Sequence, residues 1–388
     1  MRTVDGPPEA KGMAGFLLGA AGMFAVTYST QAILPQLGRA FHVSPSESGL
    51  TISVVVLGLA CGAWIWGPFS DRVGRKRSIV LASTLIVAPT VGAALAPSFV
   101  LLLACRTLQG LCMPGLLTAG VPYITEVFAP RIGGRAMGYY VTALVAGGLI
   151  GRVGVALVAA GLGWRWGIGL LAILPLAAAL VMRRSLVDLQ LPAAGRRPGG
   201  VGRQLRNRTV LQAAAAGGAF TFTFIGTFSY VVFRLERPPF GYGTVAGSLI
   251  FLLWFLGVLG PLFGRLADRI GWRRLALGAL GLAAAGLVLT LPARLPTLVL
   301  GLALVTTANW AGVTAAQLGV ASATDVDRGT ASAVYFSLYY LTSSVGGYVP
   351  GLAWERYRWD GVASAGFVAL ALAATALALR AGRGRVSS

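Results

Sequence analysis

Two arginines lie inside long apolar segments, where a charge is costly unless it meets water or a partner. They are Arg106 and Arg152. At 1.5 Å per helical residue, Arg106 lies roughly 10 Å and Arg152 roughly 12 Å from the predicted external end of its segment. A guanidinium at this depth can bind an anion or a polar, electron-rich group. The two arginines therefore predict a positively charged binding site within the apolar part of the chain.

Hydrogen-bonding side chains occur at similar depths in the same half. Tyr28 and Gln31 are three residues apart, so a helix places them on one face. Gln109 follows Arg106 by one helical turn. We expect these three side chains to share a substrate or proton pathway with the two arginines.

The second half offers polar and aromatic side chains in place of charge. Such residues suit an amphipathic guest that is apolar on its body and polar at one end. The candidates for this part of the pathway are Thr227, Tyr230, Asn309, Trp310, Tyr335 and Tyr339.

Enzymatic chemistry finds no support in the residue pattern. The sequence has no metal-ligand cluster, nucleophile triad or phosphate-binding loop. We therefore predict a protein that is not an enzyme and that uses no cofactor and no metal.

The composition requires a lipid environment for these candidates. The chain of 388 residues is 56% apolar and 11% charged, with a mean hydropathy of +0.75. One water-soluble core cannot cover so much apolar surface. The formal charge of +20 comes from basic residues that lie between apolar segments, which argues against a nucleic-acid-binding face.

Apolar segments of about 20 residues recur along the chain and predict membrane-spanning helices. The fold class is therefore an all-α integral membrane protein with twelve helices in two pseudo-symmetric six-helix bundles. The expected helices are near 13–36, 48–68, 78–96, 99–122, 135–160, 165–182, 209–233, 244–263, 275–291, 297–319, 328–352 and 361–380.

A basic stretch rich in Gly and Pro divides the chain and predicts a linker. We expect an N-terminal bundle at 1–182, the linker at 183–208 and a C-terminal bundle at 209–388. If the linker is cytoplasmic, both termini are too, and most of the 32 Lys and Arg residues then lie on the cytoplasmic side. This asymmetry predicts a multi-pass protein of the bacterial inner membrane.

An internal repeat supports the division into halves. GPFSDRVGRKR, from Gly67 to Arg77, is matched about half a chain later by GRLADRIGWRR, from Gly264 to Arg274. The two segments share Gly, Asp, Arg, Gly and the last Arg. Duplicated halves are a known transporter architecture, with the substrate site between them near mid-membrane.

The repeated segments resemble the signature loops of the major facilitator superfamily, between helices 2 and 3 and between helices 8 and 9. The resemblance implies a latch that holds the halves together in the outward-open state, and in which Glu126 pairs with Arg75. The residues that match this gating motif are Gly67, Asp71, Arg72, Gly74, Arg75 and Glu126, with Gly264, Asp268, Arg269 and Gly271 in the second half.

Two further motifs extend the resemblance, the first to the superfamily as a whole and the second to its twelve-helix drug:proton antiporters. RTLQG, from Arg106 to Gly110, matches a helix-4 motif whose arginine faces the central cavity. The glycines of helix 5 match an antiporter motif, and we expect Gly147, Gly151 and Gly154 to serve close packing. Where that motif has Gly-Pro this chain has Gly151-Arg152, as in one bacterial efflux-permease-like subgroup.

The resemblance implies alternating access, most simply proton-coupled efflux of small amphipathic organic compounds. The alternative is organic-anion uptake or exchange through Arg106 and Arg152. A second alternative is a non-transporting receptor of the same fold. The expected partners are a small-molecule substrate, protons as coupling ion and the lipid bilayer, with no nucleic acid, and we expect a monomer.

Overall fold

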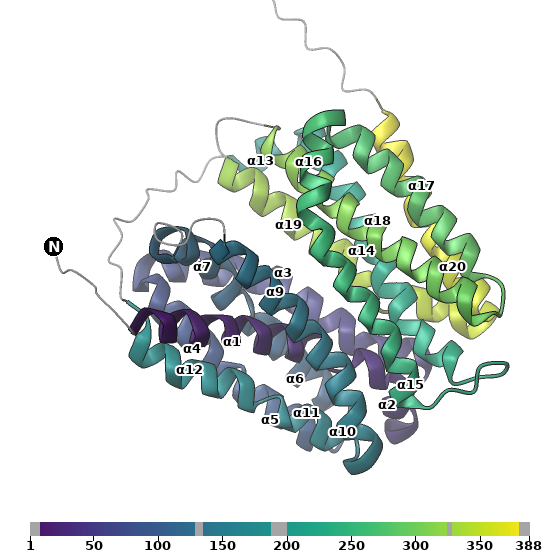
Figure 1. Ribbon diagram of the computed structural model, residues 1–388, viewed down its shortest axis with the longest axis horizontal. Helices are drawn as coiled ribbons and strands as arrows, with labels where there is room; N and C mark the ends of the chain where they lie inside the picture. The colour runs from purple at the N-terminus through teal and green to yellow at the C-terminus, as the bar shows by residue number, and fades with distance from the viewer. Residues whose placement is uncertain (1–7, 129–134, 188–199, 324–327, 380–388) are drawn as a thin grey trace, which may run out of the picture. The chain divides into compact units, whose positions relative to one another are not determined.

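This computed structural model describes residues 8–128, 135–187, 200–323 and 328–379, which are mostly helical and contain no strand. Its helices are labelled in Figure 1. Eleven stretches are long and apolar enough to cross a membrane. The last of them, Thr330–Ala378, is 49 residues long, and its backbone leaves the helical region at Arg358 (φ 54°, ψ −136°). Two crossings meet at this break, so the described chain has the twelve helices expected from its sequence.

Five of the first six crossings are built from several shorter helical pieces, and the second is a single helix. Crossings one to three comprise α1 (Pro8–Tyr28), η1 (Gln31–Ile33) and α2 (Leu34–Phe41), then α3 (Pro45–Val73), then α4 (Arg75–Leu85) and α5 (Val87–Leu95). Crossings four to six comprise α6 (Phe99–Cys112), α7 (Pro114–Tyr123) and η2 (Ile124–Phe128), then α9 (Arg135–Leu149), η3 (Ile150–Gly154) and α10 (Val155–Leu162), then α11 (Trp164–Leu170) and α12 (Ile173–Ser185).

The remaining crossings follow a short helix, α13 (Val201–Gln204). They comprise α14 (Arg208–Leu235), then α15 (Thr244–Ser248), η4 (Leu249–Leu259) and α16 (Gly260–Ile270), then α17 (Trp272–Thr290), α18 (Leu295–Ala321), and α19 (Arg328–Val345) with α20 (Val349–Ala378). The eleventh crossing runs on to the break at Arg358, beyond the predicted end at 352, because the helix continues through Trp354 and Glu355.

Local sequence signals explain where several helices begin and end. Ser44 caps α3: its hydroxyl accepts from the Glu47 backbone N–H, and the Glu47 carboxylate accepts from the Ser44 backbone N–H. This is a capping box, and Pro45 at the first helical position suits it. Gly74 and Gly271 end the helices of the two repeated motifs with nearly the same backbone angles, φ 93° and 85°. Duplicated sequence has therefore kept a duplicated turn.

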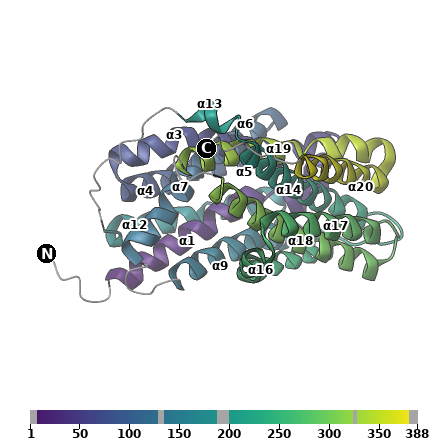
Figure 2. The same cartoon turned by 90° about the horizontal axis from the view of Figure 1, so that it is seen from above.

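The helices form two compact units, and each is considered by itself. The first contains residues up to 195 together with Val231–Trp254, and the second contains 196–230 and 255–388. In the first unit α1 runs beside α9 and α12 (Figures 1 and 2). In the second unit α17 packs along α18 and α20 around a core of alanine and leucine. The predicted domain boundaries at 183 and 208 stay a prediction.

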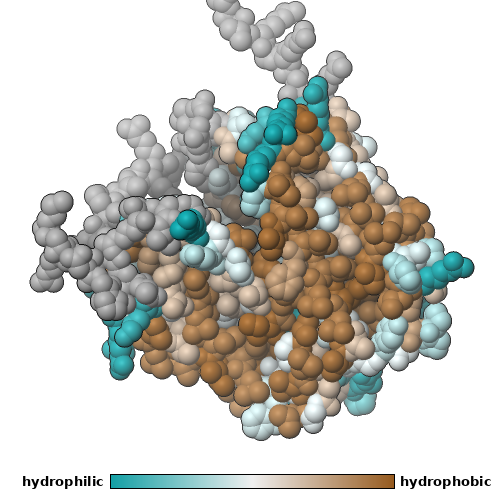
Figure 3. Space-filling view, viewed as in Figure 1, coloured by the Kyte–Doolittle hydropathy of each residue, from teal (hydrophilic) through white to brown (hydrophobic). Residues whose placement is uncertain are grey.

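Apolar side chains also dominate the outside of the helices. Leu95 and Leu372 are about as exposed as surface residues of soluble proteins, at 71% and 67%. On the face shown in Figure 3 most of the described surface is hydrophobic. Lipid is the solvent that suits such a surface, and this agrees with the integral membrane fold.

Candidate functional site

The clearest polar feature of the first unit is the side chain of Arg152, in the middle of the fifth crossing. It is fully buried. Its Nε donates to Gln31 Oε1 at 2.7 Å, and its Nη1 donates to the Gly148 carbonyl at 2.9 Å. Nη2 has no hydrogen-bond acceptor among the described residues. The guanidinium is therefore only partly satisfied by the protein.

Aromatic rings surround this guanidinium and form what we call the Arg152 site: Arg152, Gln31, Tyr28, Phe251 and Trp254. The Arg152 Cζ lies 3.9 Å from the Tyr28 ring centre, 4.5 Å from that of Trp254 and 5.3 Å from that of Phe251. Cations over aromatic faces gain roughly 0.5–2 kcal/mol each. The rings therefore help to hold a charge that the membrane interior disfavours.

Irregular backbone positions both sides of the Arg152 site. Arg152 lies on η3, a five-residue π-helical segment, whereas Phe251 and Trp254 lie on η4, a 3₁₀ segment of 11 residues. Such segments inside long helices often mark functional positions. The fifth crossing can approach the first crossing closely because it has glycines at the contact. A Cβ at Gly147 or Gly151 would clash with the carbonyl oxygens of Ala21 and Ala25.

The predicted packing glycines are only partly required. A Cβ at Gly154 would make an ordinary contact, 3.7 Å from the Ile150 side chain. No atom of the first crossing lies within 4 Å of that Cβ, so close packing against the first crossing does not require a glycine at position 154. The run of glycines in the sequence does not show which of them, Gly147 and Gly151 but not Gly154, are required for close packing.

Arg106 is also fully buried, but the protein satisfies it. Its three nitrogens donate to the carbonyls of Val26, Thr27 and Thr51, and to Ser29 Oγ and Gln109 Oε1, at 2.5–3.1 Å. These acceptors come from the first, second and fourth crossings. Arg106 ties three helices together, and this geometry favours a packing role over substrate binding.

Gln109 extends this network to the third crossing. Its side-chain amide donates to Thr90 Oγ1 at 3.0 Å. The predicted neighbourhood of Arg106 and Gln109 is therefore present, as a closed set of hydrogen bonds inside the first unit.

The gating residues of the first half lie where the motif predicts. Asp71 and Arg72 are in the last turn of α3, Gly74 makes the turn, and Arg75 begins α4. Arg75 Nη2 is 2.7 Å from Glu126 Oε1. The ion pair implied by the family resemblance is thus present, while its gating role stays a prediction.

In the second unit the predicted residues separate into two groups. The Thr227 hydroxyl donates to carbonyls of its own helix, and the Tyr230 hydroxyl donates to the Gly347 carbonyl at 2.6 Å. Both are buried and already partnered, which favours packing roles for them.

The other group forms a polar cluster. The Thr221 hydroxyl lies 2.9 Å from Tyr339 Oη and 3.3 Å from Asn309 Oδ1. The Tyr335 ring stacks on Tyr339, with centroids 5.7 Å apart. This cluster joins the seventh, tenth and eleventh crossings. Trp310 lies next to Asn309 in α18, against Gly257.

Sequence reasoning missed three residues of these sites. Phe251 and Trp254 lie in a stretch that reads simply as apolar, although their spacing of three residues was a usable signal for a shared face. Thr221 had no such signal, because threonines are common within these helices. Only packing shows which hydroxyl meets Asn309 and Tyr339.

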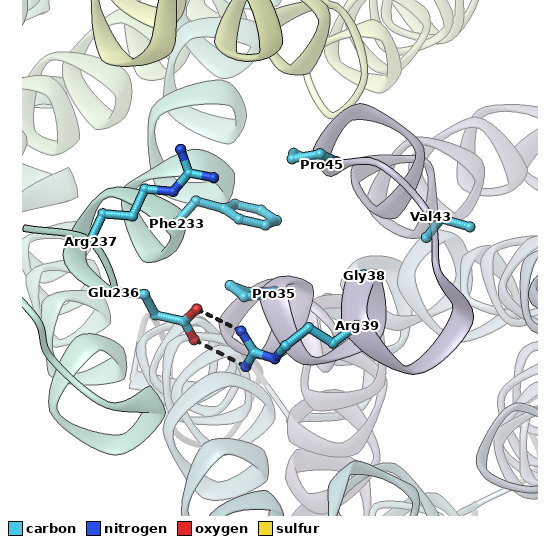
Figure 4. Close-up of a pocket in the computed structure, with 8 residues that line it drawn as sticks. All are labelled: Pro35, Gly38, Arg39, Val43, Pro45, Phe233, Glu236 and Arg237. Atoms are coloured by element: carbon cyan, nitrogen blue, oxygen red, sulfur yellow. Dashed lines mark hydrogen bonds and ion pairs between the residues drawn. The ribbon is translucent and has the colours of Figure 1, made fainter.

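A second polar feature of the first unit lies near the predicted external ends of its helices. The Arg39 guanidinium makes a two-pronged pair with Glu236, at 2.9 and 3.5 Å, beside a pocket that Pro35, Val43 and Phe233 also line (Figure 4). Gln36 donates to Thr244 Oγ1 at 2.9 Å. These contacts join α2 to the start of α15 and to the connection that precedes it.

Comparison with known proteins gives a consistent result. The model of the Major Facilitator Superfamily matches residues 16–347. An uncharacterized MFS-type transporter of Bacillus subtilis, YybF, is 30% identical over 352 residues, covering 87% of this chain and 85% of its own. The Escherichia coli inner membrane transport protein YnfM is 28% identical, covering 90% and 85%.

Among solved structures, a bacterial homolog to the human lysosomal transporter Spinster is similar in fold. Its TM-score is 0.79, at 16% identity, with 97% of this chain and 96% of that chain covered. This likeness concerns the fold alone. It agrees with the twelve helices described above.

Proposed function

The chain belongs to the Major Facilitator Superfamily of membrane transporters, and from this premise we propose that it exports small amphipathic organic molecules in exchange for protons. Secondary transporters of this fold expose a central site to each side of the membrane in turn. A ligand drives such a cycle only if it binds the alternating states unequally.

The observation that carries the proposal is the Arg152 site. Aromatic faces at 3.9–5.3 Å from a buried guanidinium offer an apolar surface and a polar anchor side by side. An amphipathic molecule needs both surfaces at once. The Thr221, Asn309 and Tyr339 cluster supplies neutral hydrogen-bonding groups in the second unit.

Proton coupling needs a group that changes its protonation state during transport. The buried charged side chains of the described chain are Arg106, Arg152 and Arg234, with no Asp or Glu among them. We therefore propose that the proton is carried by Glu126, when it leaves Arg75, or by the substrate itself. The glycine pattern of helix 5 and its likeness to the antiporter motif support exchange.

Gating is proposed to use the repeated motifs. A partly exposed pair such as Arg75–Glu126, with side chains 22% and 31% exposed, is worth little in stability and can break and reform during a cycle. We further propose a monomer in the bacterial inner membrane with both termini in the cytoplasm, on the distribution of basic residues.

The test is collapse of a pH gradient in everted membrane vesicles, read with an acridine dye, on adding cationic, neutral and anionic amphipathic compounds. Dequenching by any of these compounds, absent in vesicles without the protein, is the expected result. Uptake of radiolabelled anions with no proton movement would instead support organic-anion uptake or exchange. Ligand binding without any flux would support a receptor.

A further inference from the structure

Some N–H groups of the Arg152 guanidinium donate hydrogen bonds to the protein and others do not. A guanidinium carries five N–H groups. Gln31 takes the one on Nε, and the Gly148 carbonyl takes one on Nη1. Both N–H groups of Nη2 remain without an acceptor among the described residues, in a side chain that is fully buried. Arg106, at a similar depth, has acceptors on all three nitrogens.

We propose that this free edge of Arg152 binds the carboxylate of an amphipathic, preferably aromatic, organic acid. The inference rests on the proposed function only in taking the chain to bind an organic substrate. A carboxylate oxygen can accept a charge-assisted hydrogen bond from an N–H of Nη2, and such a bond is roughly twice as strong as a neutral one. A buried charge without a counter-charge is costly, and a carboxylate supplies that counter-charge.

The surroundings favour a monoanion over a phosphate or a cation. A phosphate dianion gains from more than one cation, but the donors of Arg106 are already taken by protein acceptors. A cationic ligand would be repelled by a guanidinium whose charge no buried carboxylate of the described chain offsets. The ligand that remains carries a single negative charge.

The rings of the Arg152 site select the rest of the molecule. Tyr28 and Trp254 lie 5.6 Å apart and tilted by 56°, so an aromatic guest can pack edge-on against them. Gly148 keeps the approach open, since a Cβ there would lie 3.0 Å from Arg152 Nη1 and 3.1 Å from Trp254 Nε1. Arg152 is fully buried whereas Tyr28 is partly exposed, so a ligand that reaches the guanidinium requires these rings to move, as alternating access provides.

The experiment measures equilibrium binding to the purified full-length protein in detergent by calorimetry, with three probes of one shape: 1-naphthoate, 1-naphthylmethanol and 1-naphthylmethylammonium. The wild-type protein is expected to bind 1-naphthoate about tenfold or more tightly than either analogue, since a charge-assisted pair is lost in both. This comparison needs no variant, and equal affinities for the three probes would overturn the proposal.

Variants then assign the effect to Arg152. Arg152→Gln should weaken 1-naphthoate binding about tenfold or more while leaving 1-naphthylmethanol binding unchanged, and Arg152→Lys should restore only part of it. Arg165→Gln is the matched control, because Arg165 also donates to a backbone carbonyl, that of Ala96, and lies 4.4 Å from a Trp ring. Unchanged 1-naphthoate affinity in Arg152→Gln would refute the assignment.

The two experiments can reject the carboxylate site and the proton-coupled efflux independently of each other. Arg152-dependent 1-naphthoate binding without proton movement in vesicles supports the carboxylate site and rejects proton-coupled efflux. Gradient collapse by cations, together with unchanged 1-naphthoate affinity in Arg152→Gln, supports efflux and rejects the carboxylate site.

Discussion

Two buried arginines at similar predicted depth differ in how many of their N–H donors remain free to bind a ligand. Arg106 reaches acceptors on two neighbouring crossings, whereas Arg152 keeps Nη2 unpaired beside three rings. Burial alone therefore does not mark a binding residue in a membrane protein. The unsatisfied Nη2 is the feature that supports the proposed binding role of Arg152, whereas the hydrogen bonds of Arg106 favour a packing role.

This difference predicts unequal effects on stability. Four of the Arg106 hydrogen bonds cross to other helices, and at about 0.6 kcal/mol each their loss in Arg106→Met should cost about 2 kcal/mol. Thermal unfolding in detergent should show a lower midpoint for Arg106→Met. A larger loss in Arg152→Gln than in Arg106→Met would contradict the packing role of Arg106.

At the scale of helices, the fifth crossing owes its position to two glycines. Backbone carbonyls of α1 occupy the space that side chains would need at Gly147 and Gly151, while space remains at Gly154. Arg152 lies next to Gly151 and is therefore held at a fixed distance from Tyr28 and Gln31. Packing of the helix pair and geometry of the Arg152 site are two results of the same close approach.

Alanine substitution along this helix should therefore have opposite outcomes. Gly151→Ala places a Cβ 2.2 Å from the Ala25 carbonyl oxygen and should cost about 1–3 kcal/mol by overpacking. Gly154→Ala, the matched control on the same helix, should leave the unfolding midpoint unchanged or raise it slightly. Equal midpoints for both variants, from thermal unfolding in detergent, would count against close packing at Gly151.

The Arg39–Glu236 ion pair joins α2 to the connection after α14, and it contributes little to the free energy of unfolding. Its Arg39 side chain is 64% exposed, so the pair is worth about 1 kcal/mol at most. Arg39→Glu should raise the labelling rate of a cysteine placed at Val43 by about fivefold or less, in a background without the three native cysteines. Exchanging the charges, Arg39→Glu with Glu236→Arg, should restore slow labelling, and faster labelling in the exchanged variant would argue against the ion pair holding these elements together.

At the scale of the whole chain, duplication has preserved geometry better than sequence. Gly74 and Gly271 adopt φ and ψ within about 10° of each other. Helices α3 and α16 end at these glycines, and α4 and α17 follow directly. Only glycine adopts this backbone region readily, which explains why both halves retain it.

Equivalent substitutions in the two halves should therefore have equivalent effects. Gly74→Ala and Gly271→Ala should each lower stability by about 1–3 kcal/mol, because alanine is strained at positive φ. Gly278→Ala, in the middle of α17 with open space around it, is the control and should be neutral or stabilising. Thermal unfolding of the three variants measures this, and a neutral Gly74→Ala would show that the turn can rearrange.

The sequence by itself determined the membrane setting, the twelve helices and the repeated turn, while the depth of both arginines stays a prediction. Each of these depends on local properties, namely hydropathy over about 20 residues, glycine backbone freedom and helical rise. The Arg75–Glu126 pair also followed, because the family motif that it belongs to is specific. Only the tertiary structure decided that Arg106 is satisfied, that Arg152 is not, and that Phe251, Trp254 and Thr221 belong to the sites. Hydrogen-bond partners distant in sequence depend on helix rotation and crossing, which apolar segments of nearly uniform hydropathy do not encode locally.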